Sequence, residues 1–308
     1  MLRRCLVCSL MLIFLGLGRP IAEASEGASS YYFPGSNTAF GVAVSPAPGF
    51  MVANQLLFYQ GSARQAVLGG RVQLDLKANA VYDYLAGFYT FKKPVWGGRL
   101  QIGAAVPAGF VDIQASASTG LGSRTLSSYN SGLGAVMTSA SLYWKKGHTH
   151  YKLTEAVFMP TGYYNPLSMA NSPRNYWSFD TSLAMTWLNK RGLEFSVTPG
   201  IMFNGRNHAT DYQSGNELHV DVAVNQFFNK QFAAGLHGYY YKQVSGDSGA
   251  GAKLGAFQGR SLGFGPAILW LPKFGKGDLS VVLKWMHDID DHNRMRGDYG
   301  QFVIGYKF

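Results

Sequence analysis

Residues 72–91 read VQLDLKANAVYDYLAGFYTF. Nearly every even position is apolar, whereas the charges Asp75, Lys77 and Asp83 all stand at odd positions. Successive side chains of a β-strand point to opposite faces, so this period of two predicts a strand with one apolar and one polar face. Stretches such as 177–188 (WSFDTSLAMTWL) repeat the pattern.

The same alternation recurs along most of the chain and predicts twelve strands. They are expected near 50–60, 72–91, 98–113, 132–144, 149–160, 176–188, 193–204, 218–228, 231–243, 260–270, 278–288 and 299–308. The connections alternate between short turns and longer loops, the latter at 61–71, 114–131, 161–175, 205–217, 244–259 and 289–298. Short turns at one rim and long loops at the other are typical of a bacterial outer-membrane β-barrel. We therefore predict an all-β, closed antiparallel transmembrane barrel of about twelve strands.

The composition agrees with strands that face lipid on one side. Only 14% of residues are charged, and 38 of 308 are glycine, against about 25% and about 7% in an ordinary soluble domain. The mean hydropathy is −0.03, and no segment offers enough consecutive apolar residues for a membrane-spanning helix. A hydrophobic share of 47% argues against disorder.

Residues 1–24 predict a cleavable signal peptide. A basic start precedes an apolar stretch over 5–18, and Ala22-Glu23-Ala24 is a small-x-small cleavage site. Both cysteines of the chain leave with this segment, and the net charge of +10 falls to 10 − 3 + 1 = +8. For an exported basic protein we expect outer-membrane lipid and lipopolysaccharide as partners rather than nucleic acid.

The last strand predicts an assembly signal. Phe302, Ile304, Tyr306 and Phe308 alternate up to the final residue, the form of a closing strand read by the barrel-assembly machinery. Three prolines oppose regular strands, because proline cannot donate a ladder hydrogen bond. We expect bulges or strand ends at Pro107, Pro199 and Pro266.

Residues 25–49 precede the barrel domain at 50–308 and are rich in glycine, proline and aromatic residues. This segment either enters the lumen as a plug or remains a tail at the rim. Alternation also assigns a lumen wall, which is either an open polar pathway or a set of mutually paired buried charges. The predicted pathway residues are Tyr31, Tyr32, Phe33, Asp75, Lys77, Asp83, Asp180, Glu194, His219, Asp221 and Lys284.

Signals for catalysis are weak. A barrel hydrolase needs a histidine beside a nucleophile or carboxylate partner, and the only such cluster is His219 and Asp221 with His237 on the next strand. We predict no catalytic residues, no metal site and no cofactor. The functional hypotheses are a channel for small hydrophobic or aromatic compounds, a structural or adhesion barrel without a pore, and, least favoured, an outer-membrane hydrolase.

Several separated motifs carry a family resemblance. They are YYFPG at 31–35, FGVAVSPAPGF at 40–50, PTGY at 160–163, RNYWSF at 174–179, YQSGNELH at 212–219 and GYYYKQVSGDSG at 238–249. With these the chain resembles the family called MetA-pathway of phenol degradation. The resemblance implies an outer-membrane barrel that transports small, often hydrophobic molecules, and it implies no catalytic residues.

Overall fold

The computed structural model describes residues 25–68, 70–119, 122–275 and 277–308. The predicted signal peptide, its cleavage site after Ala24 and both cysteines lie outside these residues. No helix among the described residues is long and apolar enough to cross a membrane.

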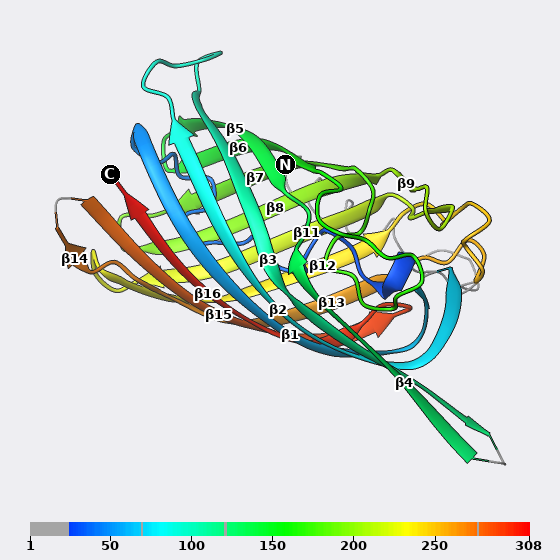
Figure 1. Cartoon of the computed structure of the whole chain (residues 1–308). Coiled ribbons are helices and arrows are strands. Elements are labelled where there is room, and N and C mark those ends of the chain that lie inside the picture. The colour runs from blue at the N-terminus through cyan, green and yellow to red at the C-terminus, as the bar shows by residue number, and fades with distance from the viewer. Residues whose placement is uncertain (1–24, 69, 120–121, 276) are drawn as a thin grey trace, which may run out of the picture.

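The described chain forms a tall antiparallel wall of strands that closes on itself (Figure 1). Two short strand pieces, β9 and β10, pair with each other in a loop. The elements are η1 (Glu26–Ala28), β1 (Gly49–Leu68), β2 (Arg71–Thr90), β3 (Arg99–Thr119), β4 (Gly122–Leu133), β5 (Met137–Lys146), β6 (Thr149–Phe158), β7 (Ser178–Leu188), β8 (Leu193–Asn204), β9 (Arg206–Asn207), β10 (Tyr212–Gln213), β11 (Glu217–Phe227), β12 (Phe232–Gln243), β13 (Arg260–Trp270), β14 (Lys273–Phe274), β15 (Gly277–His292) and β16 (Arg296–Lys307).

Closure of the wall follows from the strand pairing. β1 pairs with both β2 and β16, and β13 pairs with both β12 and β15, so the described ladder has no open end around the circumference. β4 and β5 both pair with β3 and share one place in the ring. The described ring therefore has twelve strand places, which confirms the predicted fold class. Closure leaves no unpaired sheet edge in hydrocarbon.

Alternation along the strands separates an outer from an inner face. In β13 every second residue is buried, and the residues between them are exposed. The exposed set includes large apolar side chains, with Leu262, Phe264 and Ile268 at 38%, 47% and 42% exposure. Because a barrel places its apolar band against lipid, these outward residues mark the membrane-facing surface.

The connections at the two rims differ in length, but fewer of them are long than the sequence predicts. Short turns connect β7 to β8 and β11 to β12 at the rim where β1 begins and β16 ends. Long loops at 159–177, 205–216 and 244–259 lie at the other rim, which by the usual barrel plan is extracellular.

The predicted loops at 61–71, 114–131 and 289–298 are wrong, because most of the described residues in these ranges continue paired strands. In the first two segments serine, alanine and glutamine resemble loop composition but pair across the hairpins, whereas residues 290–292 and 296–298 pair with β13 and β1. Figure 1 shows the hairpin of β3 and β4 projecting beyond the barrel.

The three prolines are accommodated without ending their strands. Pro199 pairs across to Val220 on β11, but the ladder between β7 and β8 lacks pairs at Leu183 and Ala184. Around Pro266 the ladder between β13 and β15 is likewise interrupted from Phe264 to Ala267. At Pro107 the partner of β3 changes from β5 to β4. Each proline thus lies where one neighbouring ladder is broken, which removes the need for its missing N–H.

Candidate functional site

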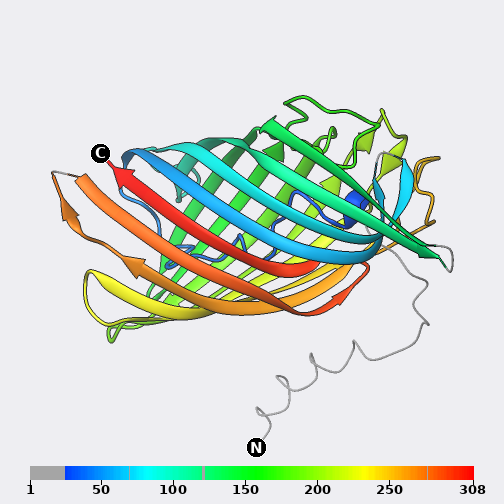
Figure 2. The same cartoon turned by 60° about the horizontal axis from the view of Figure 1, so that its bottom comes forward.

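Residues 25–48 lie inside the barrel rather than at its rim. Figure 2 shows this dark-blue segment within the ring of strands. Its sequence has no strand alternation, and Gly35 and Gly41 adopt positive φ values of 75° and 61°, which favour glycine at its bends. Side chains that point inward from the strands contact this segment at several heights along the barrel.

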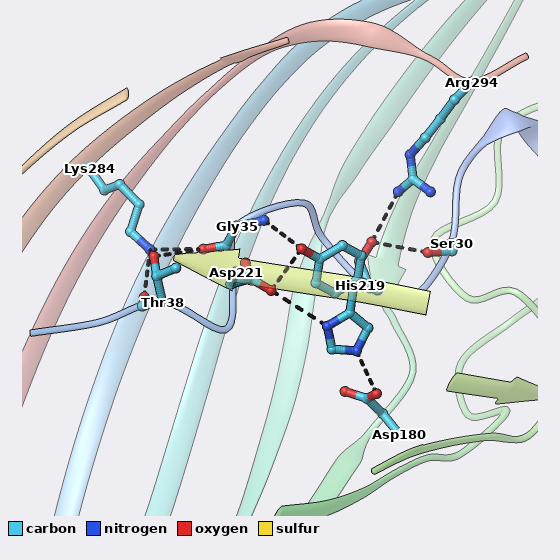
Figure 3. A network of polar contacts seen from close by, with 9 residues as sticks. Ser30, Gly35, Thr38, Asp180, His219, Asp221, Lys284 and Arg294 are labelled. Carbon is cyan, nitrogen blue, oxygen red and sulfur yellow. Dashed lines mark hydrogen bonds and ion pairs between the residues drawn. The ribbon is translucent and has the colours of Figure 1, made fainter. Parts of the chain in front are cut away.

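At the centre, Tyr32 of this segment contacts two wall residues, Asp221 and His219. Its hydroxyl donates to Asp221 Oδ2 at 2.9 Å and accepts from the Gly35 N–H at 3.0 Å. The Tyr32 ring stacks on the imidazole of His219 with ring centroids 4.2 Å apart. His219 Nε2 lies 2.8 Å from Asp180 Oδ1, and its Nδ1 lies 3.5 Å from Asp221 Oδ2 (Figure 3).

A buried lysine binds the next stretch of the segment. Lys284 Nζ donates to the carbonyl oxygens of Gly35 and Thr38 at 3.0 and 2.8 Å, and it lies 3.1 Å from Thr38 Oγ1 (Figure 3). The hydroxyl of Thr38 also lies 2.8 Å from His237 Nδ1. The amide carbonyl of Asn225 lies 3.0 Å from the remaining His237 nitrogen.

Toward the short-turn rim the wall offers acceptors to backbone N–H groups. Both carboxylate oxygens of Glu194 lie 3.0 Å from the Gly41 N–H, and Glu194 also accepts from the Ser196 hydroxyl at 2.6 Å. The Ala43 N–H donates to Thr186 Oγ1 at 3.1 Å. The polar inner wall is therefore paired with a polar backbone, as a buried polar group requires.

Two arginines that the sequence reasoning did not select hold the extracellular end. Arg174 donates from Nη2 to Ser29 Oγ at 2.9 Å and from Nη1 to the Ser29 carbonyl at 3.3 Å. Arg294 donates to the Tyr32 carbonyl at 3.1 Å, and its guanidinium lies 3.7 Å from the centroid of the Tyr241 ring. Both arginines come from loops or turns, where alternation gives no direction for a side chain.

The first residues of the segment bind the loop at 205–216. Glu26 accepts from Asn207 Nδ2 at 3.0 Å and from Thr210 Oγ1 at 2.9 Å, and its N–H donates to Ser214 Oγ at 3.3 Å. Burial raises the pKa of the Glu26 carboxyl above its ordinary value, although these side-chain hydrogen bonds oppose the rise.

A largely apolar cavity, whose lining also includes the charged Glu26, Arg174, Asp288 and Arg294, lies beside the segment in the extracellular half of the lumen. Its space of about 1120 Å³ includes the part that opens to solvent. The inner faces of β1, β2 and β3 supply small and branched apolar side chains, and Tyr59, Tyr82 and Tyr299 add aromatic rings. Phe33 of the segment meets Tyr59 and Tyr299 edge-on, with ring centroids 5.6 and 5.3 Å away. Such a site suits a small, largely apolar ligand.

This cavity explains why part of the predicted lumen wall is wrong. Asp75, Lys77 and Asp83 are exposed on the outside of β2, whereas Leu76, Ala78 and Ala80 are buried on its inner face. The prediction assumed that charged faces point into the lumen. Beside β2 the inner wall is instead apolar, with Leu76, Ala78 and Ala80 on the inner face, so the charged side chains of this strand take the outer face.

The other predicted pathway residues meet inside the barrel. Tyr31, Tyr32 and Phe33 lie in the segment, and the buried wall residues opposite the segment are Asp180, Glu194, His219, Asp221 and Lys284. Tyr31 stacks on Phe158 at 5.0 Å between ring centroids, and its hydroxyl donates to the Tyr176 carbonyl at 3.2 Å.

The arrangement of His219 does not favour a hydrolase. The imidazole is fully buried, and each of its nitrogens faces a carboxylate, so neither nitrogen is directed at a nucleophile. His237 is separately engaged by Thr38 and Asn225. Within the described residues, no cluster of three or more histidine, cysteine, aspartate or glutamate side chains has a metal-binding arrangement.

A family model for the putative MetA-pathway of phenol degradation matches residues 60–304. Among solved structures, the COG4313 outer membrane channel from Pseudomonas putida F1 is similar over 86% of this chain and 100% of its own, with 14% identity and a TM-score of 0.64. The translocator domain of autotransporter NalP from Neisseria meningitidis is similar over 86% and 91% of the two chains, with 10% identity and a TM-score of 0.46. No curated protein sequence matches the chain.

Proposed function

The chain belongs to the MetA-pathway of phenol degradation family, and from this premise we propose that it is an outer-membrane channel for small hydrophobic or aromatic compounds. The observation that carries the proposal is the apolar, tyrosine-lined cavity enclosed between the segment 25–48 and the inner faces of β1, β2 and β3. A barrel for ions or sugars would instead need a polar, water-filled path.

The cavity combines apolar side chains and aromatic rings with a few polar and charged groups. Leu68, Val111 and Ile113 supply apolar surface, whereas Tyr82 and Tyr299 offer rings and hydroxyl groups. Small-molecule sites are commonly about 300–1,000 Å³, mostly apolar with a few placed polar groups. A phenol-like solute matches both features, because it has an apolar ring and one polar group.

Passage requires the segment 25–48 to move. Below the cavity the lumen is filled by this segment and the polar side chains that bind it, with Asp221, Glu194 and Lys284 all fully or nearly buried. An apolar solute cannot replace those hydrogen bonds without leaving buried polar groups unpaired. We infer that the segment works as a gate, which shifts to join the cavity to the periplasmic rim.

The test is uptake of a radiolabelled aromatic hydrocarbon by intact Gram-negative cells that express the wild-type chain or a variant. Ala80→Trp fills the cavity from the inner face of β2, and Val81→Trp on the same strand points outward and serves as the matched control. We expect Ala80→Trp to abolish uptake above empty-vector cells, while Val81→Trp retains it. Equal uptake by wild-type and empty-vector cells would instead favour a structural barrel without a pore.

A further inference from the structure

A second cleft lies at the extracellular rim, between the turn joining β15 to β16 and the upper end of β1. Its space of about 1060 Å³ includes the part that opens to solvent, and three arginines line it: Arg64, Arg294 and Arg296. His292 also lines it, and Asp291 is its one carboxylate. With histidine neutral, the lining carries a formal charge of 3 − 1 = +2.

The neighbouring carboxylates of Asp288, Asp290 and Asp298 do not line the cleft and have hydrogen-bond or ion-pair partners of their own. Asp288 accepts from the Gly297 N–H at 2.9 Å, and Asp290 pairs with Arg260 at 3.1 Å. Asp298 lies 2.8 Å from His287 Nδ1. Although the surrounding sequence is rich in aspartate, the lining of the cleft itself thus has three arginines and one carboxylate.

Several donors of the cleft are available to a ligand. Among the described residues Arg64 makes no hydrogen bond or ion pair, and His292 Nε2 is buried without a hydrogen-bond partner. Arg296 is half exposed, and its only ion pair in the described part of the chain is a long one of 3.5 Å to Asp291. Planar guanidinium groups bind phosphate oxygens bidentately, so converging arginines are suited to a phosphate group.

The height of the cleft on the barrel indicates where that phosphate comes from. Strand register places His292 beside Arg260, which is paired with Asp290, and Arg260 beside Lys242, so these three basic side chains form a row along the rim to the cleft. On β13 the next outward residues below Arg260 are the exposed apolar Leu262 and Phe264. The basic row thus lies directly above the lipid-facing band, at the level of the outer-leaflet headgroups.

From this placement we propose that Arg64, Arg296 and His292 of this cleft bind a phosphate group of lipopolysaccharide in the outer leaflet. Arg64 and Arg296 contact the phosphate from the membrane side. Arg294 lines the apolar cavity as well and also holds the Tyr32 carbonyl. A lipid phosphate bound here therefore lies next to the anchor of the gate. The binding site does not depend on the proposed transport function.

The experiment measures binding of purified full-length protein in nanodiscs to fluorescent lipid A micelles, to enzymatically dephosphorylated lipid A and to inorganic phosphate. The test variant is Arg64→Gln with Arg296→Gln, and the control is Arg124→Gln, an exposed arginine of the distant hairpin of β3 and β4. Since a hydrogen bond to a charged group contributes about a tenfold change in affinity, we expect the double variant to bind lipid A on the order of a hundredfold more weakly.

Several results separate the proposal from its competitors. The proposal is supported if the wild type binds lipid A but not dephosphorylated lipid A, and if Arg124→Gln binds lipid A as tightly as the wild type. Equal binding of phosphorylated and dephosphorylated lipid A overturns it. Saturable binding of inorganic phosphate without binding of lipid A overturns the lipid source and assigns the cleft to a small soluble anion. Heat-modified mobility on gels verifies that every variant is folded.

Discussion

The hydroxyl of Tyr32 donates a 2.9 Å hydrogen bond to Asp221 and so joins the luminal segment to the centre of the barrel wall. Asp221 is completely buried, as is the His219 imidazole that lies 3.5 Å from the same carboxylate oxygen. A charged acceptor in an enclosed site makes this bond stronger than an ordinary surface hydrogen bond. The segment is therefore a fixed part of the closed barrel.

Removing that hydroxyl is expected to loosen the segment. Tyr32→Phe should lower the free energy of unfolding by about 1.5–3 kcal/mol and raise single-channel conductance. Tyr299→Phe is the matched control, because the Tyr299 hydroxyl is buried without a hydrogen-bond partner among the described residues. Urea unfolding in phospholipid bilayers measures both variants, and equal losses in the two would refute a specific role for Tyr32.

Lys284 should matter through the two carbonyl groups that it binds. Lys284→Met keeps the length of the side chain but leaves the Gly35 and Thr38 carbonyls without this donor. We expect residues 25–48 to become sensitive to added protease, at a cost of about 1–3 kcal/mol for each carbonyl left unsatisfied. Lys242→Met, on the exposed outer face of β12, is the control and should leave the segment resistant.

The corrected orientation of β2 gives a prediction about the outer wall. The Asn54 amide donates to the Asp83 carboxylate on the outer face, near the exposed apolar Leu85 and Val106. Asn54→Leu leaves that carboxylate without its partner and should destabilise the barrel by about 1–3 kcal/mol.

The double change Asn54→Leu with Asp83→Leu replaces the pair by apolar surface and should be neutral or stabilising. Equilibrium unfolding gives the free energy of unfolding of the wild type and both variants. A double variant less stable than the single variant would show that the polar pair itself is needed.

The loop at 244–259 should become less ordered as pH rises. Asp247 is buried there, and desolvation raises the pKa of its carboxyl to about 7. Because the folded pKa exceeds the unfolded one, the folded state holds the proton more tightly. Its stabilising contribution is complete below about pH 4 and is lost as pH rises toward 7.

Hydrogen exchange of residues 244–259 at pH 6 and pH 8, corrected for intrinsic rates, should show weaker protection at pH 8. Asp247→Asn removes the titrating group and should abolish that difference. A pH dependence that persists in this variant would assign the effect to another group.

The fold was predictable where one face of a strand meets lipid and the other meets a polar partner. On β7, β8 and β11 the charges Asp180, Glu194 and Asp221 share the parity that faces the segment. These strands alternate cleanly because their inward polar side chains bind one another and residues 25–48.

The faces of β2 and the two anchoring arginines were beyond the reach of such reasoning. Alternation divides a strand into two faces, but it does not say which face is inside when the lumen itself is apolar. Arg174 and Arg294 lie outside the regular strands and meet partners 145 and 262 positions away in sequence. Only the closed ring brings them to the segment.

The most direct test of the gate is to tether the segment at both ends. The Glu26 N–H lies 3.3 Å from Ser214 Oγ, so Glu26→Cys with Ser214→Cys places two thiols near each other in a chain whose only other cysteines are in the predicted signal peptide. Each single-cysteine variant is a control. The measurement is the initial rate of aromatic hydrocarbon uptake by cells that carry the double variant, oxidised and then reduced. Our account predicts that the disulfide blocks uptake and that reduction restores it to the single-variant rate, whereas unchanged uptake in the fully oxidised protein would contradict it.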